Sequence, residues 1–96
     1  MENLTIFLAD DDNDDRMLFT EALGELPLDL SVLTFDNGVD LMSNLLDLDL
    51  VLPDLIFLDL NMPLMNGEEC LDDIRRETNL NSVPIVIYSG FLDVEQ

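Results

Sequence analysis

The sequence has no lysine and no histidine, and it has a single cysteine. These absences exclude a histidine general base, a histidine metal ligand and a lysine Schiff base as catalytic groups. Cys70 cannot form an internal disulfide, and no histidine is present to activate its thiol, so we expect it to be a small core residue. No apolar run approaches the length of a membrane span and the N-terminus lacks a basic signal region, so we expect a cytoplasmic protein.

Basic residues are scarce, whereas acidic residues are abundant. Three arginines, Arg16, Arg75 and Arg76, stand against 22 aspartates and glutamates, which gives a formal net charge of −19. A small soluble domain more usually carries a net charge of magnitude about 2–8. This charge repels phosphate backbones and anionic lipid, so we expect no direct binding to nucleic acid or to a membrane surface. Many of these acids need no site to explain them, because surface carboxylates keep a protein soluble.

The hydrophobic pattern predicts strands that alternate with helices in one domain of 96 residues. We expect strands over 4–9, 30–35, 55–59 and 83–89, and helices over 13–23, 39–48 and 67–78, with another helix beginning near residue 91. Leu41, Leu45 and Leu48 fall on one face of the second helix. This order implies right-handed crossovers and therefore a doubly wound parallel α/β sheet.

Three of the predicted strands run directly into side chains with reactive oxygens. The first strand precedes Asp10 and Asp11, the third ends at Asp59, and the fourth ends at Ser89. The carboxyl ends of parallel strands line one edge of the sheet, where α/β proteins bind their ligands. We therefore expect three carboxylates and one hydroxyl to converge there.

Three carboxylates at one edge need a compensating charge or a proton. Two ionised groups about 4 Å apart repel by about 4 kcal/mol at an effective dielectric constant of about 20. Either one carboxylate takes up a proton, or a divalent cation lies among them. Ligands that are all oxygen favour Mg²⁺, for which Mn²⁺ or Ca²⁺ can substitute. Asp59 can then attack a phosphoryl group, since an aspartyl phosphate is an established covalent intermediate, and Ser89 can donate a hydrogen bond to a phosphoryl oxygen.

Residues 59–67 predict an irregular loop that carries part of the site. Pro63 restricts one backbone torsion, and we expect Gly67 to adopt a conformation that other residues avoid. The backbone carbonyl of Asn61 is well placed to complete a metal shell. Taken singly, Pro63 and Gly67 are explained by loop formation alone.

Taken as an ordered set, these features resemble the receiver domain of bacterial two-component response regulators. The matching segments are Asp10-Asp11 after the first strand, Asp59 at the end of the third, Met62-Pro63 followed by Gly67, and Ser89-Gly90 after the fourth. The turn over 36–38 before a leucine-rich helix matches as well. The resemblance covers essentially the whole chain.

The resemblance implies a fold, a phosphodonor and a role for each matching residue. The fold would be flavodoxin-like, with three α/β/α layers and strand order 2-1-3-4-5. Asp59 would be the phosphoacceptor, and Ser89 the switch hydroxyl. Asp11, Asp59 and the Asn61 carbonyl would bind Mg²⁺, with Asp10 acting through water. The phosphodonor would be a sensor histidine kinase or a phosphotransfer protein, so we expect a signalling domain rather than a turnover enzyme.

The sequence departs from the receiver pattern at its C-terminal end. Receivers continue into a fifth strand, which begins with a lysine that pairs with the phosphoryl group, and then a fifth helix. Residues 1–96 therefore look like an incomplete receiver, without a lysine anywhere. A charge-assisted hydrogen bond contributes about 1.5–3 kcal/mol, so its loss would weaken the coupling between phosphorylation and shape about ten- to a hundredfold. The alternative function is a scaffold that takes no phosphate and acts as a binding or dimerisation module.

Two other functions fit parts of the sequence. Acidic residues at positions 10, 12, 14 and 21 match an EF-hand calcium loop, but Asp15 stands where glycine is required, and the preceding residues are strand-like. The segment 58–61 resembles a phosphatase of the haloacid dehalogenase type, but Asn61 stands where such an enzyme needs a second aspartate. Both matches lack a residue on which the function depends.

The predicted fourth strand leaves an apolar edge that we expect to join two chains. In the order 2-1-3-4 it lies at the rim, with Val83, Ile85, Val86 and Ile87 unshielded, and such an edge invites pairing. We predict a homodimer or a swapped oligomer through this edge, and salt should promote it because the net charge opposes association. Light scattering over a range of protein and salt concentrations measures this, and a monomer throughout would contradict the prediction.

Overall fold

The computed structural model describes residues 3–47, 49–80 and 82–89. Within these ranges the chain forms one four-stranded parallel sheet and three helices. The elements, in order, are β1 (Leu4–Ala9), α1 (Asn13–Gly24), β2 (Leu30–Phe35), α2 (Gly38–Leu45), β3 (Leu55–Asp59), α3 (Gly67–Arg76) and β4 (Ile85–Tyr88). None of the described helices has the length and apolarity that a membrane crossing requires.

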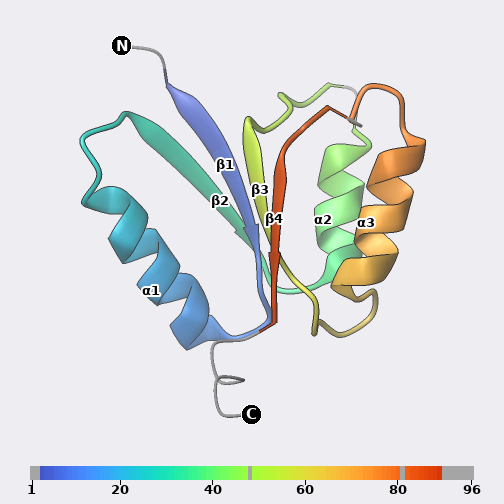
Figure 1. Ribbon diagram of the computed structural model, residues 1–96, viewed down its shortest axis with the longest axis horizontal. Helices are drawn as coiled ribbons and strands as arrows, with labels where there is room; N and C mark the ends of the chain where they lie inside the picture. The colour runs from blue at the N-terminus through green and yellow to red at the C-terminus, as the bar shows by residue number, and fades with distance from the viewer. Residues whose placement is uncertain (1–2, 48, 81, 90–96) are drawn as a thin grey trace.

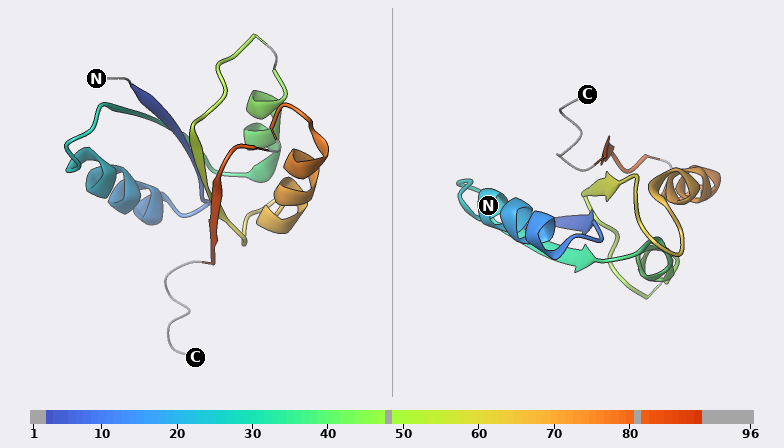
Figure 2. Two further views of the ribbon diagram at one scale, coloured as in Figure 1. Left: turned by 45° about the horizontal axis from the view of Figure 1, so that its top comes forward. Right: turned by 90° about the horizontal axis from the view of Figure 1, so that it is seen from below.

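The helices cover both faces of the sheet. Figure 1 shows α1 on one side and α2 and α3 together on the other, and the two further views in Figure 2 agree. The strand order is β2-β1-β3-β4. These observations confirm the predicted doubly wound parallel sheet and the three-layer, flavodoxin-like arrangement.

The strand register aligns the carboxyl ends of the three strands that matter for function. Ala9, the last residue of β1, lies opposite Leu58 of β3. Asp59, the last residue of β3, lies opposite Tyr88, the last residue of β4. Because the strands are parallel, the residues that follow β1 and β4 emerge at the same edge as Asp59.

A polar side chain begins each helix. Asp12 caps α1 by accepting from two backbone N–H groups of the first turn, and Asn37 caps α2 by accepting from the Asp40 N–H. Asn66 and Glu69 form a reciprocal capping box on α3. These side chains satisfy N–H groups that have no partner within the helix, which explains why the helices start where they do.

The helices α2 and α3 end earlier than the sequence pattern predicts. α2 ends at Leu45. The chain then forms a tighter turn, in which the Asp47 N–H donates to the Asn44 carbonyl three residues before it. α3 ends at Arg76 because Glu77 has an extended backbone, with ψ of 121°. Leu41 and Leu45 are buried as predicted. The third member of that face, Leu48, and the helix predicted near residue 91 lie outside the described residues.

The core confirms the prediction for Cys70 and corrects the one for Val83. Cys70 is fully buried, and burial raises the pKa of its thiol to about 11, so the residue packs as a small neutral side chain. Val83 does not lie on an open strand edge. It precedes β4 in a turn, donates its N–H to the Leu80 carbonyl, and is only 7% exposed within the core. Ile85, also predicted as unshielded, is half-buried and packs against the core, so the exposed residues of β4 are Val86 and Ile87.

Gly38→Ala is expected to destabilise the fold because α2 begins against the loop before α3. A Cβ at Gly38 would lie 2.1 Å from the Met65 carbonyl oxygen and 2.7 Å from the Cys70 sulfur. Forcing an extra methyl group into a packed core costs about 1–3 kcal/mol. Urea unfolding should show this loss in the free energy of unfolding.

Gly24→Ala is the matched control for this prediction. Nothing lies within 4 Å of a Cβ at Gly24, which is exposed at the end of α1. We expect its effect to stay within about 0.5 kcal/mol. Equal effects of the two substitutions would contradict the close approach at Gly38.

Candidate functional site

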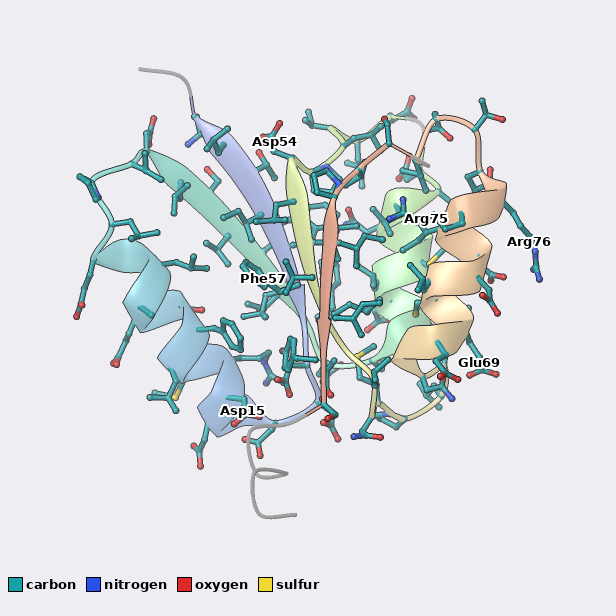
Figure 3. All side chains as sticks on the ribbon, viewed as in Figure 1. Asp15, Asp54, Phe57, Glu69, Arg75 and Arg76 are labelled. Atoms are coloured by element: carbon teal, nitrogen blue, oxygen red, sulfur yellow. The ribbon has the colours of Figure 1, made fainter. Side chains whose placement is uncertain are left out.

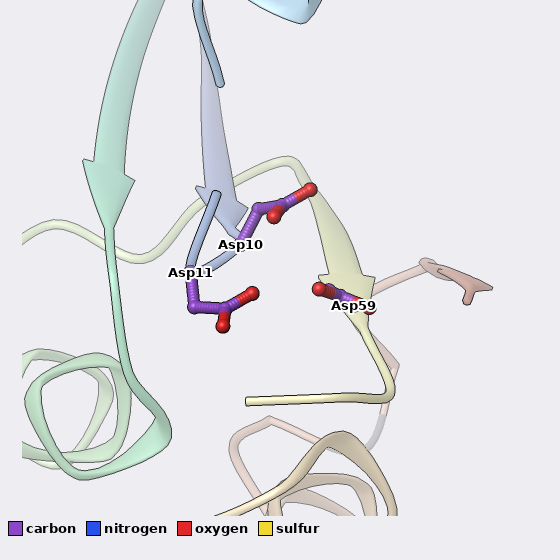
Figure 4. A group of neighbouring side chains, drawn as sticks. All are labelled: Asp10, Asp11 and Asp59. Carbon is purple, nitrogen blue, oxygen red and sulfur yellow. The ribbon is translucent and has the colours of Figure 1, made fainter. Parts of the chain in front are cut away.

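Three carboxylates meet at the edge where the strands end. Asp10 and Asp11 follow β1, and Asp59 ends β3. One oxygen from each of the three lies within 4.8 Å of the others, and Figure 4 shows Asp11 and Asp59 facing each other beside Asp10. Asp10 is fully buried and Asp59 is 3% exposed, whereas Asp11 is open to solvent. The structure thus brings together the three acids that the sequence predicts as neighbours.

The carboxylate of Asp10 is held by hydrogen-bond donors on both of its oxygens. Its Oδ1 accepts the Asp12 N–H at 2.9 Å, and its Oδ2 accepts the Tyr88 hydroxyl at 2.7 Å. The backbone carbonyl of Asp10 accepts Nη1 of Arg16 at 2.7 Å. A buried carboxylate requires such partners, because burial without them is strongly unfavourable.

Asp59 is less well compensated than Asp10. Its Oδ1 accepts the Asn61 N–H at 3.1 Å. Burial raises the pKa of Asp59 to about 6, the Asn61 N–H opposes this rise, and the negative charges of Asp10 and Asp11 add to it. A carboxyl with this pKa is partly protonated slightly below neutral pH. A divalent cation among the three acids would favour its ionised form.

A fourth acid, Asp15, lies beside the cluster and was not predicted from the sequence. It lies on the first turn of α1 at the end of the sheet where the strands stop (Figure 3), and it is 9% exposed. Burial raises the pKa of Asp15, and the nearby charges of Asp10 and Asp12 raise it further. The spacing of Asp15 and Phe19, one helical turn apart, could have placed both on the inward face of α1.

Positive charge near the cluster comes from Arg16, whereas the two arginines of α3 are remote. Figure 3 shows Arg75 and Arg76 on the far side of the molecule from Asp15. Arg75 donates to the Val83 carbonyl at 3.3 Å, and Arg76 pairs with Asp73 at 3.0 Å on the surface. The charge of the four clustered acids is therefore not neutralised by these two side chains.

The loop after β3 is shaped by close approach rather than by an unusual torsion at Gly67. Gly67 does not have a positive φ, which corrects the predicted reason for a glycine there. A Cβ at Gly67 would lie 2.5 Å from the Asp59 carbonyl oxygen and 2.7 Å from the Leu60 Cα, so there is no room for a larger residue. In this loop the positive φ, of 67°, belongs to Leu64. The Met65 N–H donates to the Pro63 carbonyl at 2.7 Å across it.

Ser89 and Asn61 lie beside the acids through the pairing of β3 with β4. Ser89 is half-buried and follows Tyr88, the residue opposite Asp59. The Leu60 N–H donates to the Tyr88 carbonyl at 2.8 Å, which extends this pairing into the loop. Asn61 is exposed, and its N–H donates to Oδ1 of Asp59.

The EF-hand alternative does not fit the geometry. Asp10 lies at the end of a β-strand, where an EF-hand requires a helix. Oδ1 of Asp12 accepts the backbone N–H groups of Asp14 and Asp15 as a helix cap. The acids at positions 12 and 14 therefore begin a helix instead of encircling a calcium ion with Asp10.

The donor set of the cluster fits a divalent cation that prefers oxygen. Three carboxylates are in reach of one another, and within the part of the chain that the structure describes no cysteine sulfur joins them, while the sequence has no histidine. Mg²⁺ takes one or two carboxylates and keeps several waters, which suits a cluster that is open to solvent on the Asp11 side. The same ligands accept Mn²⁺.

Asp59→Asn is expected to stabilise the cation-free protein at neutral pH. The pKa of Asp59 is about 6 in the folded state, against 3.8 for an unperturbed aspartate. This carboxyl therefore contributes stability that is fully present below the unfolded pKa and is lost as the pH rises through the folded pKa. The loss at neutral pH is about 3 kcal/mol, which the asparagine avoids. Urea unfolding in a chelating buffer between acidic and neutral pH measures this difference.

Asp72→Asn on α3 is the control, because Asp72 is an exposed acid outside the cluster. We expect this variant to follow the parent chain at every pH. Adding Mg²⁺ should reduce the advantage of the Asp59 variant, since a cation compensates the parent carboxylates. A parent chain that is as stable as the Asp59→Asn variant at neutral pH without cation would contradict the unfavourable ionisation of Asp59.

Comparison with known proteins identifies the family. The model of the response regulator receiver domain matches residues 6–96. Response regulator Rcp1 from Synechocystis sp. is 30% identical over 86 residues, which cover 85% of this chain and 58% of Rcp1. This chain therefore spans little more than half the length of that relative.

Solved structures agree with the sequence match. The crystal structure of the phosphorylated cyanobacterial phytochrome response regulator RcpA has a TM-score of 0.87 and 32% identity, covering 98% of this chain and 70% of RcpA. The Mn²⁺-bound form of Rcp1 has a TM-score of 0.84 and 28% identity, covering 95% of this chain and 70% of Rcp1. Because the family match extends over nearly all of its residues, this chain belongs to the response regulator receiver domains of two-component signalling.

Proposed function

We propose that this receiver accepts a phosphoryl group on Asp59 from a sensor histidine kinase or a phosphotransfer protein, in a reaction that depends on Mg²⁺. The observation that carries the proposal is the convergence of Asp10, Asp11 and Asp59 within 4.8 Å at the carboxyl end of the sheet. The phosphorylated state named for RcpA and the Mn²⁺ named for Rcp1 support it, because both proteins share this fold.

The ligand roles in the proposal are supported by the cluster for the three acids and are implied by the receiver family for Asn61. Asp11, Asp59 and the backbone carbonyl of Asn61 would hold Mg²⁺, for which Mn²⁺ or Ca²⁺ could substitute. Asp10 would act through water, since its two oxygens already accept hydrogen bonds from Asp12 and Tyr88. When bound, the cation would supply positive charge against the carboxylates and the phosphoryl oxygens.

Asp59 would be the nucleophile of the transfer. A carboxylate oxygen of Asp59 forms a bond to phosphorus while the bond between phosphorus and the donor imidazole nitrogen breaks, and that nitrogen keeps the electron pair. The product on Asp59 is an acyl phosphate. The Asn61 N–H on Oδ1 orients the carboxylate for this attack. Pro63 and Gly67 shape the loop that carries these groups, and Ser89 would donate a hydrogen bond to a phosphoryl oxygen.

The partners and the location of the domain are separate predictions from phosphate acceptance. The family implies a kinase or phosphotransfer protein as the partner. Association through the edge of β4 and a cytoplasmic location stay predictions. Val86 and Ile87 are exposed at that edge and support the association prediction, because an exposed apolar edge strand can pair with another chain.

Incubation with acetyl phosphate and Mg²⁺, followed by intact-mass spectrometry, tests the proposal. We expect the parent chain to gain the mass of one phosphoryl group and Asp59→Asn to gain none. Chelation of the cation should abolish the gain. Asp72→Asn should be phosphorylated like the parent chain, because Asp72 lies on the exposed surface of α3.

The alternative function is separated by the same measurement. No mass gain in a folded parent chain with saturating Mg²⁺ would overturn the proposal and favour a receiver-like scaffold that binds partners without taking phosphate. A gain that persists in Asp59→Asn would place the phosphoryl group elsewhere and would equally overturn the role of Asp59.

A further inference from the structure

We propose that Tyr88 is a positioning residue of this site, whose hydroxyl holds the buried Asp10 carboxylate in the orientation that cation binding requires. The inference rests on the proposed function, because it concerns the same site. It goes beyond that function in assigning a role to a side chain of β4 that is neither a ligand nor the phosphoacceptor. Tyr88 makes separate contacts through its hydroxyl, its ring and its backbone.

The hydroxyl of Tyr88 is one of the groups that fix the direction of the Asp10 side chain. It donates to Oδ2 at 2.7 Å, while the Asp12 N–H donates to Oδ1 at 2.9 Å. The two donors come from opposite ends of the described chain, and Asp10 is fully buried. A carboxylate that is bonded on both oxygens and enclosed on all sides has little freedom to rotate.

The ring of Tyr88 is placed by aromatic contacts that do not involve its hydroxyl. Its centroid lies 5.2 Å from that of Phe19 on α1, and Phe19 lies 5.4 Å from Phe57 of β3. Such tilted pairs stabilise the packing independently of any hydrogen bond. Removal of the hydroxyl alone should therefore leave the ring, and the fold around it, in place.

The backbone of Tyr88 connects the same residue to the phosphoacceptor. Tyr88 lies opposite Asp59 in the β3–β4 register, and its carbonyl accepts the N–H of Leu60 at 2.8 Å. Ser89, the proposed switch hydroxyl, is the next residue. Tyr88 thus ties the end of β1 to the end of β4 and to the loop that begins at Asp59.

Loss of the hydroxyl would leave one buried oxygen of Asp10 without this donor. The carboxylate could then turn away from Asp11 and Asp59, with which it would hold a cation. Partners that orient metal ligands typically change metal affinity about 10- to 100-fold when they are removed. Because Asp10 acts through water in the proposed site, we expect an effect at the lower end of this range.

Tyr88→Phe is the test, and Ser31→Ala is its matched control. Ser31 also loses a hydroxyl that donates to a side chain, that of Asn3 at 3.1 Å, but near the other end of the sheet. Titration calorimetry with Mg²⁺ should show about tenfold weaker binding for Tyr88→Phe and unchanged binding for Ser31→Ala. Phosphorylation by acetyl phosphate should be slower for Tyr88→Phe at low Mg²⁺ and should recover at high Mg²⁺.

Tyr88 also offers a direct spectroscopic readout. It is the only tyrosine of a chain without tryptophan, so the intrinsic ultraviolet emission above that of phenylalanine reports on this residue alone. A hydrogen bond from an excited phenol to a carboxylate quenches its emission. Asp10→Asn should therefore brighten Tyr88, whereas the parent chain should stay quenched when Mg²⁺ binds, because the positioning role keeps the hydrogen bond to Asp10 in place.

The outcomes separate the positioning role from the proposed function. If the parent chain binds Mg²⁺ and Tyr88→Phe binds it equally well or more tightly, the positioning role is overturned while the proposed function stands. A loss of stability in Tyr88→Phe without a change in affinity would likewise show a purely structural contact. If the parent chain binds no Mg²⁺ at all, the cation-dependent function fails, and the role of Tyr88 in serving it fails with it.

Discussion

The parallel pairing of β1 with β3 forces acidic side chains together, and the rest of the site follows from that constraint. Asp10 and Asp59 emerge from neighbouring strands at one edge, and Asp11 comes with Asp10. Carboxylates at this spacing repel by several kcal/mol unless protons, donors or a cation compensate them. The fold tolerates the repulsion because the opposing strands are anchored by a well-packed core.

The chain compensates the two buried acids unequally, and the difference matches their proposed roles. Asp10 accepts hydrogen bonds on both carboxylate oxygens, and its backbone carbonyl accepts one from the Arg16 guanidinium. Asp59 accepts one backbone N–H, and burial with the neighbouring charges raises its pKa to about 6. A group that must bind phosphorus has to keep an oxygen available, whereas a supporting acid can be bonded completely.

Two predictions were wrong for reasons that concern packing rather than pattern. Gly67 was expected to need an unusual backbone torsion. The actual reason for a glycine is lack of space, because the backbone of Asp59 and Leu60 passes within 3 Å of where a Cβ would lie. Val83 was expected at an open edge, but a turn at Leu80 folds it into the core before β4 begins. Both errors arise because sequence patterns describe neighbours along the chain and not those across it.

The sequence by itself determined the order of strands and helices, the parallel sheet and the three acids at its edge. It did so because apolar periodicity reports burial along one element, and a parallel topology necessarily gathers strand ends. Only the tertiary structure decided that Asp15 joins these acids and that Tyr88 bonds to Asp10, 78 positions away. Such contacts depend on the rotation of α1 and on the register of β4 against β3, which are set by packing between elements that are distant in sequence.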